Sequence, residues 1–156
     1  MDFKFCPRCG TLTIKKQFGD DILSYCTNCN KGLHDFFYTC VIVACVNKND
    51  EVAVIKQSYG EDKYVLVAGF VNMHESLEEC VKREVKEELG LDTLNLKYMN
   101  SYPMDNKDNL MVAYKACVDG LISLSSEVRE VKFVKKEEAL KLLSEAKIAR
   151  KVVESL

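Results

Sequence analysis

The segment from residue 69 to residue 91 constrains the fold most, because it specifies a single helix with both ends marked. Ser76 is a favourable N-cap residue, and Glu79 three positions later completes a capping box. Gly90 stands where helices commonly end in the left-handed conformation. Between these ends a hydrophobic side chain recurs every four residues and forms a stripe that is expected to be buried: Leu77, Val81, Val85 and Leu89.

The same helix carries three glutamates, Glu84, Glu87 and Glu88, within about one turn, because residues three and four apart share a face. Glu84 and Glu88 project within roughly 20° of Leu77, at the edge of the hydrophobic stripe. A buried carboxylate needs a partner, and closely spaced oxygen ligands suit Mg²⁺ or Mn²⁺. The alternative is a solvated helix in which Arg83 pairs with Glu87. The inward direction of two glutamates favours the metal site.

Two Cys-x-x-Cys pairs lie near the N-terminus, Cys6 with Cys9 and Cys26 with Cys29, and sixteen residues separate them. This spacing is typical of a structural zinc site with four thiolate ligands, which leaves no open position for a substrate. A redox dithiol is the alternative, but it would not require a second pair. About 30 residues cannot form a core alone, so we expect zinc to supply the folding energy of a ribbon over residues 1–34.

The composition indicates one ordinary globular domain beside this small module. The chain has 156 residues, of which 47% are hydrophobic and 29% charged, and its net charge is −2. That charge predicts neither general nucleic-acid binding nor a membrane surface, and no hydrophobic run approaches the roughly 18 residues of a membrane-spanning helix. The other four cysteines stand singly in hydrophobic stretches and indicate buried thiols in a cytoplasmic protein: Cys40, Cys45, Cys80 and Cys117.

The remainder of the chain, residues 35–156, mixes strand patterns with helix patterns and indicates an α/β sandwich. Strands are predicted over residues 38–46, 51–56, 64–71, 94–100, 109–118 and 130–134, and helices over residues 136–144 and 147–156. Within the ribbon, residues 11–25 are predicted to form a hairpin.

The glutamate helix and the loop before it resemble the Nudix box. Every specified position of that motif is filled, by Gly69, Glu75, Arg83, Glu84, Val85, Glu87, Glu88, Gly90 and Leu91. The resemblance implies an α/β/α sandwich with a mixed sheet, and hydrolysis of a nucleoside diphosphate linked to another group. It also implies that the three helix glutamates and the Gly69 carbonyl hold Mg²⁺ or Mn²⁺, with Arg83 and Glu75 orienting the carboxylates.

The Nudix pattern often adds an acid from a distant loop, as a metal ligand or as the catalytic base. Two residues near the predicted strand at 130–134 are candidates, Glu127 and Glu130. Glu127 is preferred for its place in the Glu-x-x-Glu pattern of the family, and Glu130 is kept as a candidate substrate contact. Either acid could instead be solvated in the loop.

The order of ribbon, strand pair and Ala-Gly-Phe-Val before the box resembles the NADH pyrophosphatase branch over essentially the whole chain. Members of that branch carry an array Ser-Gln-Pro-Trp-Pro-Phe-Pro-x-Ser followed by Leu-Met. This chain keeps Ser101, Pro103 and the Leu-Met pair, but has Met104 and Asn106 where the tryptophan and phenylalanine stand. The stacking surfaces expected there are therefore lost.

We therefore expect a Mg²⁺- or Mn²⁺-dependent pyrophosphohydrolase whose first substrate candidate is NAD(H), cleaved to AMP and nicotinamide mononucleotide. ADP-ribose, ADP-sugars, FAD and capped RNA ends are alternatives, and a non-catalytic module that senses a nucleotide is the alternative from another class. The family resemblance implies a homodimer. Candidate substrate contacts are Phe70, Ser101, Tyr102 and Glu130. Other aromatic residues that could stack on a base are Phe36, Phe37, Tyr38 and Tyr59, although each is more simply read as core or surface.

Overall fold

The protein is described by a computed structural model that covers residues 2–104 and 108–156. The chain divides into two compact units, Met1–Phe37 and Tyr38–Leu156, and this division lies close to the predicted boundary after residue 34. Asn106, one of the changed positions in the expected array, lies outside the described residues. Each unit is considered by itself.

The first unit contains a three-stranded antiparallel sheet of β1 (Ile14–Phe18), β2 (Asp21–Cys26) and β3 (Lys31–Leu33), in that order. The predicted hairpin is confirmed, because every residue of β1 pairs with β2. The third strand is not predicted by the sequence, since Lys-Gly-Leu has neither the length nor the alternation of a strand pattern.

The core of this unit is very small. Among its described residues the buried ones are Cys6, Ser24, Tyr25 and Cys26. Several large hydrophobic side chains are exposed instead: Phe5, Leu12, Ile14, Phe18, Ile22, Phe36 and Phe37. Since so little hydrophobic surface is buried, the cysteines must contribute to folding in another way.

The second unit is built on a mixed six-stranded sheet. Its order is β7-β8-β4-β5-β9, with β6 paired to β4. The β4–β8 pair is parallel and the other pairs are antiparallel. The strands are β4 (Tyr38–Val46), β5 (Val52–Gln57), β6 (Val67–Phe70), β7 (Asp92–Pro103), β8 (Asn109–Asp119) and β9 (Val128–Val134).

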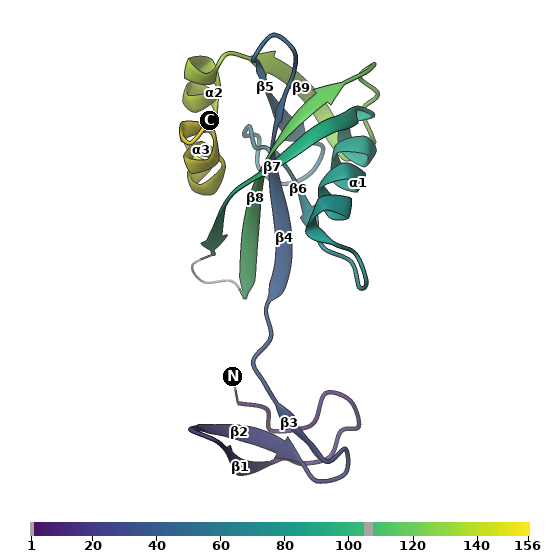
Figure 1. The fold of residues 1–156 in the computed structure, drawn as a ribbon, viewed down its shortest axis with the longest axis vertical. Coiled ribbons are helices and arrows are strands. Elements are labelled where there is room, and N and C mark those ends of the chain that lie inside the picture. Colours follow the sequence, from purple (N-terminus) through teal and green to yellow (C-terminus); the bar gives the residue numbers. More distant parts are fainter. Residues whose placement is uncertain (1, 105–107) are drawn as a thin grey trace. The chain divides into compact units, whose positions relative to one another are not determined.

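Helices cover both faces of this sheet, with α1 (Leu77–Leu89) on one side and α2 (Lys136–Leu142) and α3 (Lys147–Glu154) on the other (Figure 1). The alternation of side chains along the central strand β4 explains the two layers. Val41, Val43 and Cys45 pack in the cluster that includes α1, whereas the intervening Ile42, Ala44 and Val46 pack in the cluster that includes α2 and α3. The predicted α/β/α sandwich with a mixed sheet is confirmed.

The two ends of α1 form as the sequence predicts. The Glu79 backbone N–H donates to the Ser76 hydroxyl at 3.2 Å, and the Ser76 backbone N–H donates to the Glu79 carboxylate at 2.8 Å. At the other end Gly90 adopts a φ of 73°, and its N–H donates to the Lys86 carbonyl at 3.0 Å. The capping box and the glycine stop therefore fix where the glutamates lie along the helix.

A register shift between β5 and β9 changes which side chains of β9 face helix α1. Lys56 pairs with Glu130 and Gln57 pairs with Val128, so Arg129 is the extra residue of a β-bulge. Val128 accordingly packs in the cluster that includes α1. After the extra residue, the even-numbered side chains of β9 face the other side of the sheet, and Val134 packs in the cluster that includes α2 and α3.

The close approach at Gly90 gives a stability prediction. An added Cβ would lie 2.8 Å from the Ser123 Cβ, in a backbone conformation that alanine disfavours. We expect Gly90→Ala to lower the free energy of unfolding by about 2–3 kcal/mol in urea. Gly60 has a similar φ of 78° but no atom within 4 Å, so Gly60→Ala should cost only about 1 kcal/mol. Equal losses would contradict a role for the Ser123 contact.

A candidate metal centre on helix α1

The three glutamates of α1 differ in exposure as their helical positions predict. Glu88 is 5% exposed and the Glu84 side chain is 12% exposed, whereas the Glu87 side chain is 60% exposed. Two carboxylates therefore lie on the side of the helix that faces the sheet. Such groups are costly to bury unless they are paired or bind a cation.

Glu84 lies directly against the backbone of Gly69 on β6. A Cβ built on Gly69 would meet the Glu84 carboxyl carbon at 1.9 Å, so a residue with a side chain would displace the carboxylate. The glycine is placed there by antiparallel pairing with Val41 on the central strand β4. The absence of a side chain at residue 69 thus makes the space in which Glu84 lies.

Arg83 ties the glutamates to the loop that precedes the helix. Its Nε and Nη2 donate to the two Glu75 carboxylate oxygens at 2.7 and 3.0 Å. Its Nη1 donates to Glu84 at 2.5 Å and to Glu87 at 3.0 Å, and Nη2 also donates to the Phe70 carbonyl at 3.0 Å. These contacts use all five N–H groups of a guanidinium. Arg83 therefore orients the Glu75, Glu84 and Glu87 carboxylates, and it has no N–H group left to donate to a substrate.

Glu75 is held in the charged form by this arrangement. The hydrogen bonds from Arg83 are the main cause that lowers the pKa of Glu75 to about 2, and the Asn72 backbone N–H adds a further bond at 2.8 Å. The loop is tightly turned here, with His74 at a φ of 67°. An ionised Glu75 in a fixed position can in turn hold Arg83 against the two glutamates.

Glu88 is in the opposite situation. Burial, followed by the negative charge of Glu84, raises the pKa of Glu88 to about 8. Its Oε2 is buried without a hydrogen-bond partner among the described residues. Burial likewise raises the pKa of Glu84. A buried carboxylate oxygen without a donor, beside a second carboxylate, fits the oxygen ligand set of a hard divalent cation.

We use the name acid cluster for four residues, Glu84, Glu87, Glu88 and Glu127. Glu127 comes from the loop between β8 and β9. That loop is bonded along the C-terminal end of α1, where the Ser123 N–H donates to the Leu89 carbonyl at 2.9 Å and the Ser125 N–H to the Glu88 carbonyl at 3.3 Å. The charge of Glu127 contributes to the raised pKa of Glu88. Glu127 is exposed, so it lies at the rim of the cluster.

The acid cluster is more open than a closed metal cage. Among the residues that the structure describes, the four cysteines are the group whose ligand atoms all lie within 4.8 Å of one another. Like charges repel, and Arg83 draws Glu87 toward the helix surface. The carboxylates therefore do not close on a single point.

Glu130 is not brought together with these acids. Its carboxylate accepts hydrogen bonds from the Tyr64 hydroxyl at 3.0 Å and pairs with Lys132 at 3.1 Å. Lys132 is the main cause that lowers the pKa of Glu130. Tyr64 packs in the cluster on the α2 and α3 face. Glu130 lies within β9 and pairs with Lys56, whereas Glu127 precedes β9 in the loop that is bonded to the end of α1, and this accounts for the difference.

The candidate substrate contacts are also separated by the fold. Phe70 follows Gly69, is 56% exposed and packs edge-on against Tyr38 with ring centres 5.8 Å apart. Ser101 and Tyr102 lie on β7 at the edge of the sheet, where Ser101 is exposed and Tyr102 packs in the cluster on the α2 and α3 face. Only Phe70 of these three adjoins the acid cluster directly along the chain.

The rim also holds a side chain whose position no motif marks. The Ser58 backbone N–H donates to the Glu127 carbonyl at 2.8 Å, so Tyr59 follows a residue that is bonded to the loop carrying Glu127. Burial and then the charges of Glu127, Glu88 and Glu84 raise the pKa of Tyr59. From the sequence, Tyr59 is only one of several aromatic residues that could stack on a base. Finding it at this rim requires the register of β5 against β9, which local patterns do not reveal.

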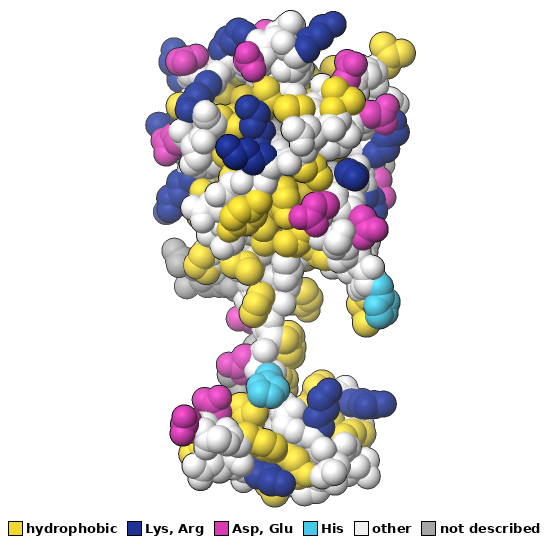
Figure 2. All heavy atoms as spheres, viewed as in Figure 1, with side chains coloured by type: hydrophobic (Ala, Val, Ile, Leu, Met, Phe, Trp, Pro, Cys, Tyr) yellow, Lys and Arg dark blue, Asp and Glu magenta, His cyan; other side chains and the backbone are white. Residues whose placement is uncertain are grey.

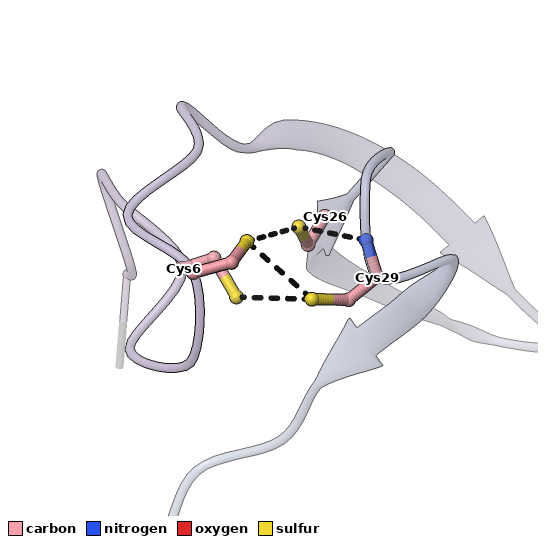
Figure 3. Close-up of side chains that lie close together, drawn as sticks. Cys6, Cys26 and Cys29 are labelled. Carbon is pink, nitrogen blue, oxygen red and sulfur yellow. Dashed lines mark hydrogen bonds between the residues drawn. The ribbon is translucent and has the colours of Figure 1, made fainter.

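The four cysteines of the first unit converge as the paired motif predicts, with the sulfurs of the labelled Cys6, Cys26 and Cys29 directed toward one another (Figure 3). The Cys9–Cys26, Cys9–Cys29 and Cys6–Cys29 sulfurs are 3.5, 3.4 and 4.0 Å apart. Zinc–sulfur bonds of about 2.3 Å in a tetrahedron require sulfurs about 3.8 Å apart. The cluster therefore fits a tetrahedral ion.

Charges of both signs are interspersed on the face of the second unit seen in Figure 2, as the net charge of −2 suggests. Hydrophobic side chains are exposed between them. This face has no field of a single sign that would attract a polyanion by charge alone. Among the described helices, none has the length and hydrophobicity that crossing a membrane requires.

Comparison with known proteins agrees with this geometry. The family model described as "NUDIX domain" matches residues 37–156. A Vibrio atlanticus protein named "NAD-capped RNA hydrolase NudC" is 33% identical over 113 residues, which cover 72% of this chain and 41% of that protein. The Haemophilus influenzae protein of the same name is 32% identical over 157 residues, which cover 96% of this chain and 58% of that protein. The chain thus spans about half the length of the curated relatives it matches.

Solved structures give the same result for the fold. A NUDIX hydrolase from Nitrosomonas europaea superposes with a TM-score of 0.64 over 87% of this chain and 80% of that one. Its sequence identity is 21%, so this likeness concerns the fold alone.

The raised pKa of Glu88 predicts how stability depends on pH when Mg²⁺ and Mn²⁺ are left out. A carboxyl whose folded pKa is about 8, against an ordinary value of 4.5, favours the folded state below pH 4.5 and loses that contribution as the pH rises through 8. Between about pH 5 and pH 9 this loss should reach roughly 2–4 kcal/mol in the wild-type protein.

Glu88→Gln should remove that loss, because the amide stays neutral. Glu87→Gln, at a position 60% exposed, should leave it unchanged. Urea unfolding of the three proteins at both pH values measures the difference. The same pH dependence in wild type and Glu88→Gln would contradict the buried, protonated state of Glu88.

Proposed function

Because the chain belongs to the Nudix family, we propose that it is a divalent-metal-dependent pyrophosphohydrolase that cleaves the diphosphate linkage of a nucleoside diphosphate derivative. The observation that carries this proposal is the buried, unpartnered oxygen of Glu88 beside Glu84, in the space that Gly69 leaves open. A structural helix gains nothing from two desolvated carboxylates, whereas a metal site requires them.

The residues that would hold the metal are Glu84, Glu87, Glu88 and the carbonyl of Gly69, with Mg²⁺ or Mn²⁺ as the expected ion. When bound, divalent ions neutralise charge on the diphosphate and lower the pKa of a bound water. The Arg83 Nη1 donates to both Glu84 and Glu87 and so holds these two carboxylates beside each other. Its own position is fixed by the bidentate pair with Glu75.

Glu127 is the proposed proton acceptor for the attacking water. It is exposed at the rim, close enough to Glu88 for its charge to affect that group. An exposed carboxylate can take up a proton and release it to solvent, which a buried one cannot do as readily. Glu130 is already bonded to Tyr64 and Lys132, which argues against it for this role.

The substrate class is proposed from the site and from the relatives together. The matched relatives are named for hydrolysis of NAD-capped RNA. NAD(H), cleaved to AMP and nicotinamide mononucleotide, is our first candidate for this chain, and an NAD-capped RNA end carries the same linkage. The exposed ring of Phe70 beside Gly69 offers a flat surface for a base or nicotinamide. ADP-ribose, ADP-sugars and FAD are the other candidates.

The deciding experiment is a turnover panel of NADH, NAD⁺, NAD-capped RNA, ADP-ribose, FAD and ADP-glucose with Mg²⁺ or Mn²⁺. We expect hydrolysis with mononucleotide products that mass spectrometry identifies. A preference for another member over NAD(H) would assign the altered segment of residues 101–109 a different specificity. Nucleotide binding without any turnover would instead favour the sensing module.

The ligand assignment predicts the effect of three substitutions. Glu88→Gln and Glu87→Gln should each lower turnover by about 100-fold or more, because a charge that holds the metal is lost. Gly69→Ala should do the same by displacing the Glu84 carboxylate, and its backbone does not require a glycine conformation. Gly19→Ala, at an open position in the first unit, is the control and should keep full activity. Wild-type rates in the two glutamine variants would refute the metal site.

We also propose that Cys6, Cys9, Cys26 and Cys29 bind a structural zinc ion. Removing zinc with a chelator should expose the first unit to limited proteolysis within residues 1–37, and added zinc should restore protection. Metal analysis should find one zinc ion per chain. A zinc-free preparation that resists the protease equally would contradict the proposal. A homodimer and a cytoplasmic location remain predictions from the family resemblance and the cysteine usage.

A further inference from the structure

The diphosphate of the proposed substrate would bring negative charge to a place that is already acidic. Among the described residues, Arg83 is the guanidinium in contact with the helix glutamates of the acid cluster, and all five of its N–H groups are engaged within the protein. Bound metal ions would meet some phosphate oxygens. Further contacts to the diphosphate must come from another donor at the rim, and a neutral donor would not compete with the metal for the carboxylates.

The segment from Gln57 to Tyr59 is tied by its backbone to the loop that carries Glu127. Gln57 pairs with Val128, and the Ser58 N–H donates to the Glu127 carbonyl at 2.8 Å. The β-bulge at Arg129 immediately follows this pairing. Bulges change the direction of neighbouring side chains and recur beside active sites. Here the Ser58 bond holds the segment before Tyr59 against the segment that carries Glu127.

The hydroxyl of Tyr59 is held in a way that leaves its hydrogen available. The Gln57 Nε2 donates to the Tyr59 Oη at 3.1 Å, so the phenolic oxygen acts as acceptor in that bond. Its own O–H is then free to donate to a different acceptor. The ring is 58% exposed, which gives a substrate access to it.

From this geometry we propose that Tyr59 contacts the substrate, its O–H donating a hydrogen bond to a diphosphate oxygen at the acid cluster, and that Gln57 is a positioning residue that acts through Tyr59. The inference rests on the proposed function and extends it by two residues outside the family motif. The raised pKa of Tyr59 is consistent with a phenol that stays protonated and keeps its donor.

Tyr59→Phe tests this contact, since it removes the hydroxyl and keeps the exposed ring. A hydrogen bond to a charged group is worth enough that kcat/KM should fall by about 10- to 100-fold on the best substrate of the panel. Binding of α,β-methylene ADP-ribose, whose linkage cannot be hydrolysed, should weaken by about 10-fold in calorimetry with Mg²⁺ present. Mn²⁺ binding measured by electron paramagnetic resonance should not change, because Tyr59 is not a metal ligand.

Tyr98→Phe is the matched control. Tyr98 is another exposed tyrosine, at 54%, and its ring packs edge-on against Tyr114 on a different part of the sheet. This variant should match the wild-type protein in turnover and in analogue binding. Equal values for Tyr59→Phe and Tyr98→Phe would overturn the proposal.

A double-mutant cycle tests the role of Gln57. Gln57→Met removes the donor and keeps an unbranched side chain of similar length, so it should lower kcat/KM by a few-fold in the wild-type background. In the Tyr59→Phe background it should have no further effect, because Gln57 acts only on the hydroxyl. Additive losses would show that Gln57 acts independently and would overturn its positioning role.

The readouts separate this inference from the proposed function. Turnover in the wild-type protein with an unaffected Tyr59→Phe variant rejects the tyrosine contact alone. Absence of turnover with analogue binding that weakens in Tyr59→Phe rejects the hydrolase and supports the contact. A wild-type protein that neither hydrolyses the panel nor binds the analogue rejects both.

Discussion

The constraint on which the second unit depends is that one side of α1 must bury both a hydrophobic stripe and two carboxylates. The stripe binds the helix to the sheet, and it lets Glu84 and Glu88 reach the strand that carries Gly69. Burial of a carboxylate is unfavourable without compensation. Arg83 compensates Glu84 by an ion pair, whereas Glu88 is left with a raised pKa and an unpartnered oxygen. The energetic cost at Glu88 is the feature that points to a cation.

The sheet supplies the rest of the site through its connections. The β8–β9 loop is bonded to the C-terminal end of α1 and so places Glu127 beside Glu88. The β5–β6 segment reaches the same rim because Ser58 is bonded to Glu127. Parts of the chain about 70 residues apart are thus joined by a few backbone hydrogen bonds, since strands β5 and β9 are neighbours in the sheet. Small changes of register there would move several side chains together.

The first unit depends on a different interaction. It buries too little hydrophobic surface to be stable from packing alone, and its four thiols converge at separations that suit a tetrahedral ion. The Thr11 hydroxyl lies 3.3 Å from the Cys9 sulfur. Metal binding by such a cluster favours the thiolate form, because the thiolate is the ligand.

The sequence by itself determined the features that follow from local spacing. These are the capped helix, the inward direction of Glu84 and Glu88, the close glycine at residue 69 as part of a motif, and the convergence of the paired cysteines. The tertiary structure alone decided that Glu127 and not Glu130 joins the acid cluster, and that Tyr59 lies beside it. The physical reason is that Glu127 precedes β9, in a loop bonded to Ser58 and to the end of α1, whereas Glu130 lies within β9 and pairs with Lys56. No periodicity in the sequence marks these contacts, because they join segments that lie far apart along the chain.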